Sequence, residues 1–187
     1  DDKVIFSRSD CPPLDQKLNL PYAELVYAML YIARWTRPDI ALPIAILCRF
    51  ASNPAKKHWK AALRVLGYLK GTKHEGITFS PHTENSGLYG FADAEFATID
   101  PDTRKSFGGQ VLMYAGGPIS WKVKQHARPA GSTSVSEYYT LSAAAEDVKA
   151  VSQLLAELGL PEPEGIPIFE DNSITRMIAN RECKEKR

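Results

Sequence analysis

The pattern of apolar positions divides the chain into a helical first part and a strand-rich second part. The run "YAELVYAMLYIARWT" repeats apolar residues at helical spacing, with Leu25, Met29 and Ile32 on one stripe. The segment "RPDIALPIAILCRFAS" predicts a second helix, which Pro43 disturbs near its start. The segment "SNPAKKHWKAALRVLGYLKGT" predicts a third helix, closed by Gly71.

The third helix is predicted to be amphipathic, because its apolar and basic residues fall on different sides. We expect the apolar stripe to be buried and the basic stripe to face outward. The two stripes are Trp59, Leu63 and Leu66, and Lys56, Lys60 and Arg64.

Short runs typical of strands follow, separated by Gly, Pro and Asp clusters. They are "GITFS", "GLYGFADAEF", "SFGGQVLMYAG" and "PISWKVKQHA". A long helix is predicted over 134–158, then a strand in "IPIFEDN" and a helix in "SITRMIAN". Antiparallel strands followed by a helix and one further strand predict an α+β domain with a mixed sheet. We place this domain at 76–187, after an irregular lead-in and a helical region at 1–75.

Composition narrows the class of protein only a little. The chain has 187 residues with 44% hydrophobic and 24% charged side chains, which favours a globular domain with a helical appendage. Its net charge of +1 means that any nucleic-acid contact must come from a local basic patch. Cys11, Cys48 and Cys183 have no metal or CxxC spacing, so we expect a reducing, intracellular compartment. No secretory signal and no membrane span is expected.

Three acidic residues stand out, each in a different predicted element. Asp93 lies inside the aromatic strand "LYGFADAEF", although Asp is unfavourable in strands. Glu137 lies at the start of the long helix, and Asp171 at the end of the later strand. Each also has a structural explanation. Asp93 could face solvent on an open sheet, Glu137 could form a capping box with Ser134, and Asp171 could cap the next helix.

Taken together, these acids match the needs of a two-metal phosphodiester hydrolase. Such a site draws carboxylate oxygens from separate elements around two divalent cations, and Mg²⁺ prefers hard oxygen ligands. Phosphate contacts would need basic side chains nearby. The candidates are Arg104 and Lys105, in the loop after the Asp93 strand, and Lys122 and Lys124 in the strand "SWKVKQHAR", although a solvated face is the alternative for these two lysines.

Four segments resemble the Pol polyproteins of copia-type LTR retrotransposons. The region that precedes their RNase H domain resembles "TRPDIALPIAILCRFASNPAKKHWKAALRVLGYLKGT". Their RNase H domain is similar to "YGFADAEFATIDPDTRKSFGGQVLMYAGGPISWKVKQ", "STSVSEYYTLSAAAEDVKAVSQLLAELG" and "IFEDNSITRMIAN". The resemblance implies an RNase H-like mixed sheet preceded by a helical connection region. It also implies that Asp93, Glu137 and Asp171 bind Mg²⁺ or Mn²⁺ and hydrolyse the RNA strand of an RNA–DNA hybrid.

The resemblance further implies a last strand and a final helix with a fourth acid, neither of which precedes Arg187. The domain is therefore expected to be incomplete at its C-terminal side. This expectation leaves a second function open. The chain could be a catalytically inactive, domesticated RNase H-like protein that binds protein partners as a subunit of a larger assembly.

Overall fold

The computed structural model describes residues 20–80, 86–97, 99–100, 102–163 and 165–180. The predicted lead-in before residue 20, together with Cys11 and Cys183, lies outside these residues. The chain divides between Ile77 and Thr78 into two compact units, a helical unit and a sheet unit.

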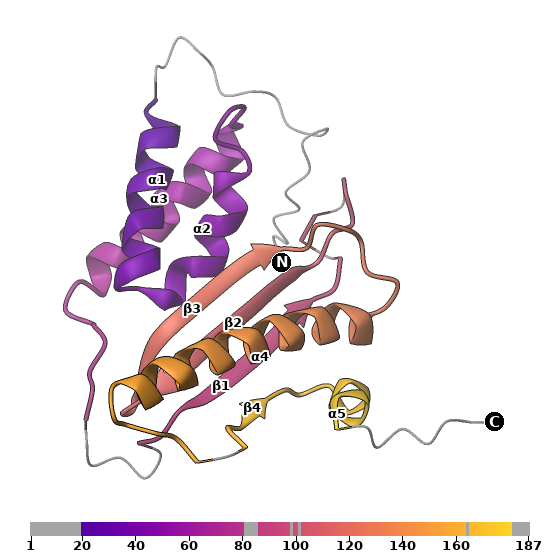
Figure 1. The fold of residues 1–187 in the computed structure, drawn as a ribbon. Helices are drawn as coiled ribbons and strands as arrows, with labels where there is room; N and C mark the ends of the chain where they lie inside the picture. The colour runs from indigo at the N-terminus through magenta and orange to yellow at the C-terminus, as the bar shows by residue number, and fades with distance from the viewer. Residues whose placement is uncertain (1–19, 81–85, 98, 101, 164, 181–187) are drawn as a thin grey trace. The chain divides into compact units, whose positions relative to one another are not determined.

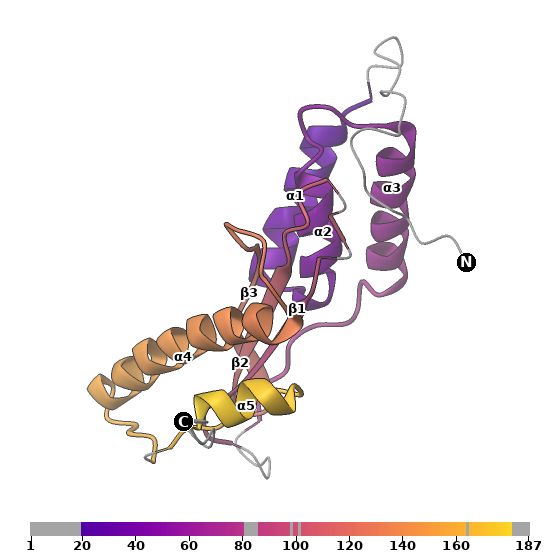
Figure 2. The ribbon, with the colours of Figure 1, turned by 90° about the vertical axis from the view of Figure 1, so that its right-hand side faces the viewer.

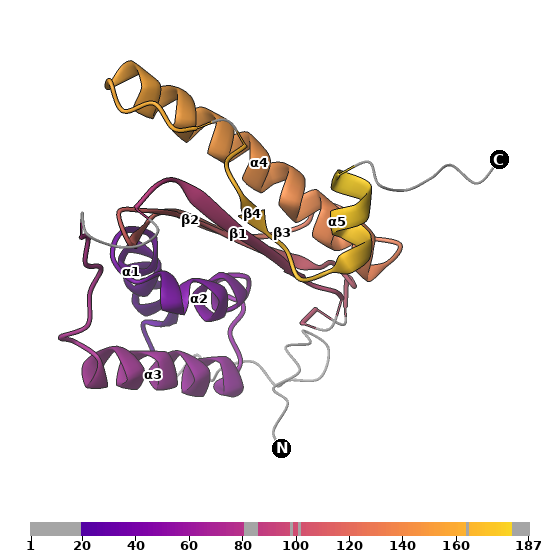
Figure 3. The ribbon, with the colours of Figure 1, turned by 90° about the horizontal axis from the view of Figure 1, so that it is seen from below.

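The helical unit contains three α-helices and one short 3₁₀ helix within residues 20–77, and α1–α3 pack together (Figure 3). Pro43 falls in the first turn of its helix, where the missing N–H leaves no hydrogen bond unmade. The elements are α1 (Tyr22–Trp35), η2 (Pro38–Ile40), α2 (Ala41–Cys48) and α3 (Lys56–Gly71).

The buried face of α1 differs from the predicted one. Of the expected stripe only Met29 is buried, and Ile32 is exposed. The Tyr22 hydroxyl donates a hydrogen bond to the Leu47 carbonyl oxygen at 2.9 Å, which anchors the start of α1 against α2. The residues of α1 that are buried are Tyr22, Val26, Met29 and Ala33.

Leu63 and Leu66, predicted to be buried against the sheet domain or another chain, are 43% and 42% exposed in the single chain, so their burial against another chain stays a prediction. Trp59 is half-buried, and the buried residues of this helix are His58 and Ala62. Helix α3 therefore packs against its neighbours with the side that carries His58 and Ala62. The basic stripe is exposed as predicted: Lys56, Lys60 and Arg64.

His58 is a structural residue of the helical unit. Its ring stacks on Phe50 with the centroids 3.9 Å apart, and its Nδ1 accepts the backbone N–H of Ala55 at 2.9 Å. Burial lowers the pKa of His58 to about 4. The neutral ring therefore packs as a core side chain at neutral pH.

The sheet unit is α+β, which confirms the predicted fold class. In its described part the sheet has four strands in the order β3-β2-β1-β4, with β4 parallel to β1 and the other pairs antiparallel (Figure 1). This mixed sheet is compatible with an RNase H-like fold. The elements are β1 (Tyr89–Glu95), β2 (Phe107–Tyr114), β3 (Gly117–Gln125), α4 (Thr133–Glu157), β4 (Ile168–Phe169) and α5 (Ser173–Ala179).

Residues 76–80, predicted as a strand, form none. The backbone N–H of Ser80 donates to the Ala115 carbonyl oxygen at 2.8 Å, so this segment meets the sheet without forming a ladder. In the described residues, no helix is both long and apolar enough to cross a membrane.

Helix α4 covers one face of the sheet (Figure 2). On β1 this face carries Gly90, which has no side chain, and the small residues Ala92 and Ala94, so the helix can approach closely. A Cβ atom at Gly90 would lie 3.7 Å from Cγ2 of Val148. The core under α4 is a cluster of Leu88, Leu112, Val148 and Leu155.

Candidate metal centre

Asp93 occupies the middle of β1, on the face opposite Ala92 and Ala94. Its partner in the β1–β2 register is Gly109, where an added Cβ would meet no atom within 4 Å. The carboxylate is exposed. An acid is tolerated in this aromatic strand because α4 does not cover its side of the sheet.

Glu137 lies near the start of α4, and its side chain is buried, with 4% exposure. The N-cap of this helix is Ser132, whose hydroxyl oxygen accepts the backbone N–H of Val135 at 3.3 Å. The capping-box explanation is therefore wrong, because Ser134 lies inside the helix.

Asp171 lies two residues after the end of β4 and is exposed. The N-cap of α5 is Asn172, whose side-chain oxygen accepts the backbone N–H of Thr175 at 3.0 Å. The helix-capping explanation for Asp171 is therefore also wrong. Its position is determined by the short parallel pairing of β4 with β1.

The structure brings these three acids together. One carboxylate oxygen from each of Asp93, Glu137 and Asp171 lies within 4.8 Å of the others. The donors are hard oxygens from three separate elements, which is the ligand type that Mg²⁺ and Mn²⁺ prefer. Their role as metal ligands stays a prediction.

The charge at this cluster is poorly compensated. Burial, followed by the nearby charges of Glu170 and Asp93, raises the pKa of Glu137 to about 7, against a hydrogen bond from the backbone of Ala94. Oε2 of Glu137 is buried and has no hydrogen-bond partner among the described residues. A buried acceptor without a partner is unfavourable, so a cation fits this donor set.

A fourth carboxylate, which the sequence analysis did not select, lies beside the cluster. Glu170 is only 6% exposed, and burial raises its pKa, as does the carboxyl group of the neighbouring Asp171. Its Oε1 accepts the backbone N–H of Asn172 at 3.1 Å. The sequence contained a signal for it: strand alternation places Glu170 with Ile168, on the side opposite Phe169 and Asp171.

Arg104 and Lys105 lie in the loop that joins β1 to β2. Arg104 is exposed and has a φ of 52°, and its backbone N–H donates to the Asp100 carbonyl oxygen at 2.8 Å. The buried Asp100 carboxylate accepts from the Gln125 amide at 2.7 Å and from the Thr103 hydroxyl. This loop is therefore held against the end of β3 by a buried acid.

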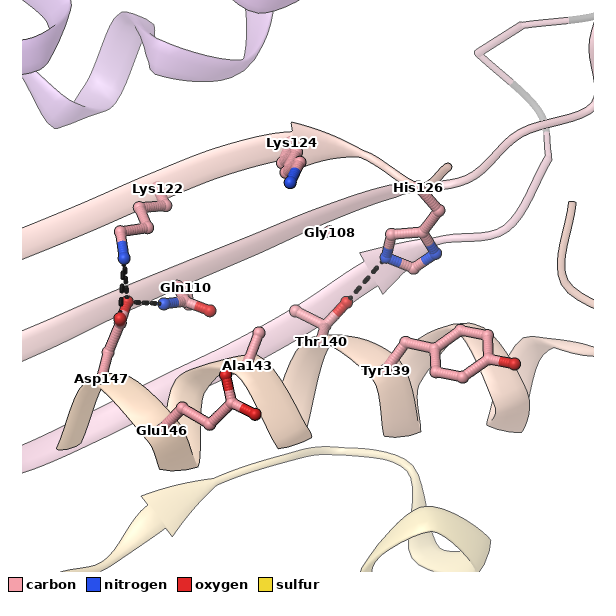
Figure 4. Close-up of a pocket in the computed structure, with 10 residues that line it drawn as sticks. All are labelled: Gly108, Gln110, Lys122, Lys124, His126, Tyr139, Thr140, Ala143, Glu146 and Asp147. Atoms are coloured by element: carbon pink, nitrogen blue, oxygen red, sulfur yellow. Dashed lines mark hydrogen bonds and ion pairs between the residues drawn. The ribbon is translucent and has the colours of Figure 1, made fainter. Parts of the chain in front are cut away.

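Lys122 and Lys124 lie elsewhere, on the sheet face that α4 covers. They line a pocket of about 230 Å³ between β2, β3 and α4 (Figure 4). Nζ of Lys122 lies 2.6 Å from Oδ2 of Asp147, which also accepts from the Gln110 amide. The structure therefore does not bring these two lysines to the face that carries Asp93.

The fold and the cluster define an α+β domain that carries three converging carboxylates at the centre of a mixed sheet. The chain is 33% identical over 179 residues to the retrovirus-related Pol polyprotein from transposon TNT 1-94 of Nicotiana tabacum, covering 94% of the chain and 13% of that protein. It is 31% identical over 160 residues to the retrovirus-related Pol polyprotein from transposon RE2 of Arabidopsis thaliana, covering 85% of the chain and 11% of that protein. Homologues of the chain are therefore retrovirus-related Pol polyproteins of copia-type transposons, which is consistent with a domain derived from a retrotransposon Pol polyprotein.

A further relative is shorter. The chain is 37% identical over 129 residues to the secreted RxLR effector protein 161 of Plasmopara viticola, which covers 69% of the chain and 89% of that protein. By contrast, the chain spans only 13% and 11% of the length of the two polyproteins above. No protein-family model and no solved structure matches the chain.

Proposed function

We propose that this copia-type Pol region is the RNase H portion of its polyprotein and hydrolyses the RNA strand of an RNA–DNA hybrid. One observation carries the proposal: the carboxylate oxygens of Asp93, Glu137 and Asp171 meet within 4.8 Å although they come from three elements. Phosphodiester hydrolysis by two divalent cations requires such a meeting of carboxylates.

The three acids would hold Mg²⁺ or Mn²⁺ between them, and they differ in their exposure to solvent. Asp93 and Asp171 are exposed, so their oxygens are open to a substrate phosphate as well as to a cation. Glu137 is buried and approaches from the start of α4. Divalent cations held there would supply two effects: a lower pKa for the attacking water and stabilisation of the charge on the leaving oxygen.

Nucleic-acid contacts are assigned first to Arg104 and Lys105, in the loop that leaves the Asp93 strand. Arg104 is exposed, so its guanidinium can reach a phosphate. Lys122 is a weaker candidate, because its ion pair with Asp147 already neutralises its charge. Lys124 is exposed on the same α4-facing side as Lys122 and would contact a hybrid only away from the acids.

A cleavage assay on the purified chain tests the proposal. An RNA–DNA hybrid is incubated with Mg²⁺ and, separately, with Mn²⁺, and the expected result is cleavage of the RNA strand that is lost in Asp93→Asn and Asp171→Asn. The matched control is Glu95→Gln, since Glu95 lies on the same strand and the same sheet face. Cleavage that persists in both Asn variants would show that the site assignment is wrong.

A second candidate function is a non-catalytic binding or assembly role. The relative named as a secreted effector favours it, because 89% of that protein is covered by this chain and its name describes an effector rather than a polyprotein. A chain that stays folded and binds protein, yet cleaves no hybrid with either metal, would support this second role.

A further inference from the structure

We propose that Glu170 is a positioning residue of the metal centre, a fourth carboxylate that supports cation binding from behind Asp171. The inference rests on the proposed metal-binding role of Asp93, Glu137 and Asp171 and adds a residue to it. Glu170 lies outside the group of acids whose oxygens meet within 4.8 Å, so we assign it to support rather than to direct coordination.

The burial of Glu170 is the first observation. Glu170 directly precedes the exposed Asp171 in the sequence, yet Glu170 is only 6% exposed. Ile168 pairs with Gly90 of β1, on the face that α4 covers, and Glu170 follows Ile168 by two positions. Glu170 is thus buried near Glu137, whose pKa is raised by burial and by the charge of Glu170.

The state of its two oxygens is the second observation. Oε1 accepts the backbone N–H of Asn172 at 3.1 Å, which fixes the orientation of the carboxyl group. Oε2 is buried and has no hydrogen-bond partner within the part of the chain that the structure describes. Oε2 of Glu137, in the same acidic cluster, is in the same state.

Two buried acceptors without partners next to three converging carboxylates are unfavourable unless positive charge or a donor is supplied. A cation with its bound water supplies both. Groups that support the direct ligands of a metal in this way typically contribute about 10- to 100-fold to metal affinity. Glu170 is placed for that role because its unpartnered Oε2 is buried and the residue directly precedes Asp171.

A purely structural role is the competing explanation, since the bond from Asn172 also orders the turn before α5. Glu170→Gln separates the two roles. A glutamine keeps the shape and the acceptor for Asn172, and it replaces only the second oxygen and the negative charge.

The test has two measurements on the whole chain. Titration with Mn²⁺ and with Mg²⁺, monitored by calorimetry, gives the metal affinity, and a thermal melt without metal gives the melting temperature. We expect Glu170→Gln to bind Mn²⁺ about 10- to 100-fold more weakly than the wild type, while its metal-free melting temperature stays equal or rises. Glu157→Gln, an exposed acid on α4, is the control and should bind like the wild type.

The outcomes separate this inference from the proposed function. If Asp93→Asn loses Mn²⁺ binding and Glu170→Gln binds like the wild type, Glu170 has no part in the centre and the three-acid site stands. If Glu170→Gln melts lower without metal and keeps its affinity, its role is structural and the inference is overturned. If the wild type binds neither metal, the metal centre and this inference fail together.

Discussion

The Thr175 hydroxyl donates a hydrogen bond to the backbone carbonyl oxygen of Ser134 at 3.2 Å, between residues 41 positions apart. The bond joins the first turn of α5 to the first turn of α4. Asp171 lies just before α5, and Glu137 is the fifth residue of α4. Figures 1 and 3 show α5 beside this end of α4. The buried Thr175 hydroxyl thus connects the segments that carry Asp171 and Glu137.

Thr175→Val should weaken this connection. Removing one buried hydrogen bond, while the Ser134 carbonyl oxygen remains, is expected to lower the unfolding free energy of the sheet unit by about 1 kcal/mol. Denaturant unfolding followed by far-UV circular dichroism measures the change. Thr133→Val, at an exposed position of α4, is the control and should change little. Equal effects of the two variants would contradict the assigned role of the bond.

The contribution of Glu137 to the stability of the metal-free protein should fall as the pH rises from about 4.5 to about 7. The folded state holds a proton on Glu137 up to a pKa of about 7, whereas the ordinary value is 4.5. In that range the folded protein binds more protons than the unfolded chain, so each step up in pH favours unfolding.

Glu137→Gln isolates this effect, because the difference from the wild type cancels the other titrating groups. The unfolding free energy of the variant relative to the wild type should rise between pH 4.5 and 7, by at most about 3 kcal/mol. Glu157→Gln should keep the wild-type pH profile. A pH-independent difference between Glu137→Gln and the wild type would show that the burial of this acid has no energetic consequence.

Gly108 should not tolerate a side chain, whereas its neighbour should. A Cβ atom at Gly108 would lie 2.8 Å from Nε2 of His126 and closer still to the Thr140 hydroxyl. Gly108→Ala is therefore expected to lower the unfolding free energy by about 1–3 kcal/mol through overpacking between β2 and α4. Gly109→Ala, on the open face, should change it little. Thermal melts of both variants check the pair, and similar losses would contradict the packing described.

Arg37→Lys should destabilise the helical unit although the charge is kept. Arg37 binds Asp39 through Nε and Nη2, and its Nη1 donates to the Thr72 carbonyl oxygen at 3.0 Å. A lysine cannot make these bonds together, so a loss of about 2 kcal/mol is expected. Arg34→Lys, at an exposed position of α1, is the control in denaturant unfolding. Unchanged stability in Arg37→Lys would show that the forked contact contributes nothing.

Local patterning predicted most of the elements in their order, and it selected the three acids that the structure brings together. Apolar spacing marked the helices and most strands, and an acid inside an aromatic strand marked Asp93. The apolar pattern did not identify the buried side of every helix. In α3 the stripe with Leu63 and Leu66 looked more apolar than the one with His58 and Ala62, yet the latter is buried.

The sequence by itself determined which segments become helices and strands, and hence which elements carry Asp93, Glu137 and Asp171, because these depend on neighbours along the chain. Only the tertiary structure decided which sides are covered. The parallel pairing of β4 with β1 buried Glu170 and left Asp171 exposed. The packing of α4 placed Lys122 against Asp147, away from the face of Asp93. The reason is physical: periodicity defines the faces of an element, but burial depends on the neighbour that packs against each face.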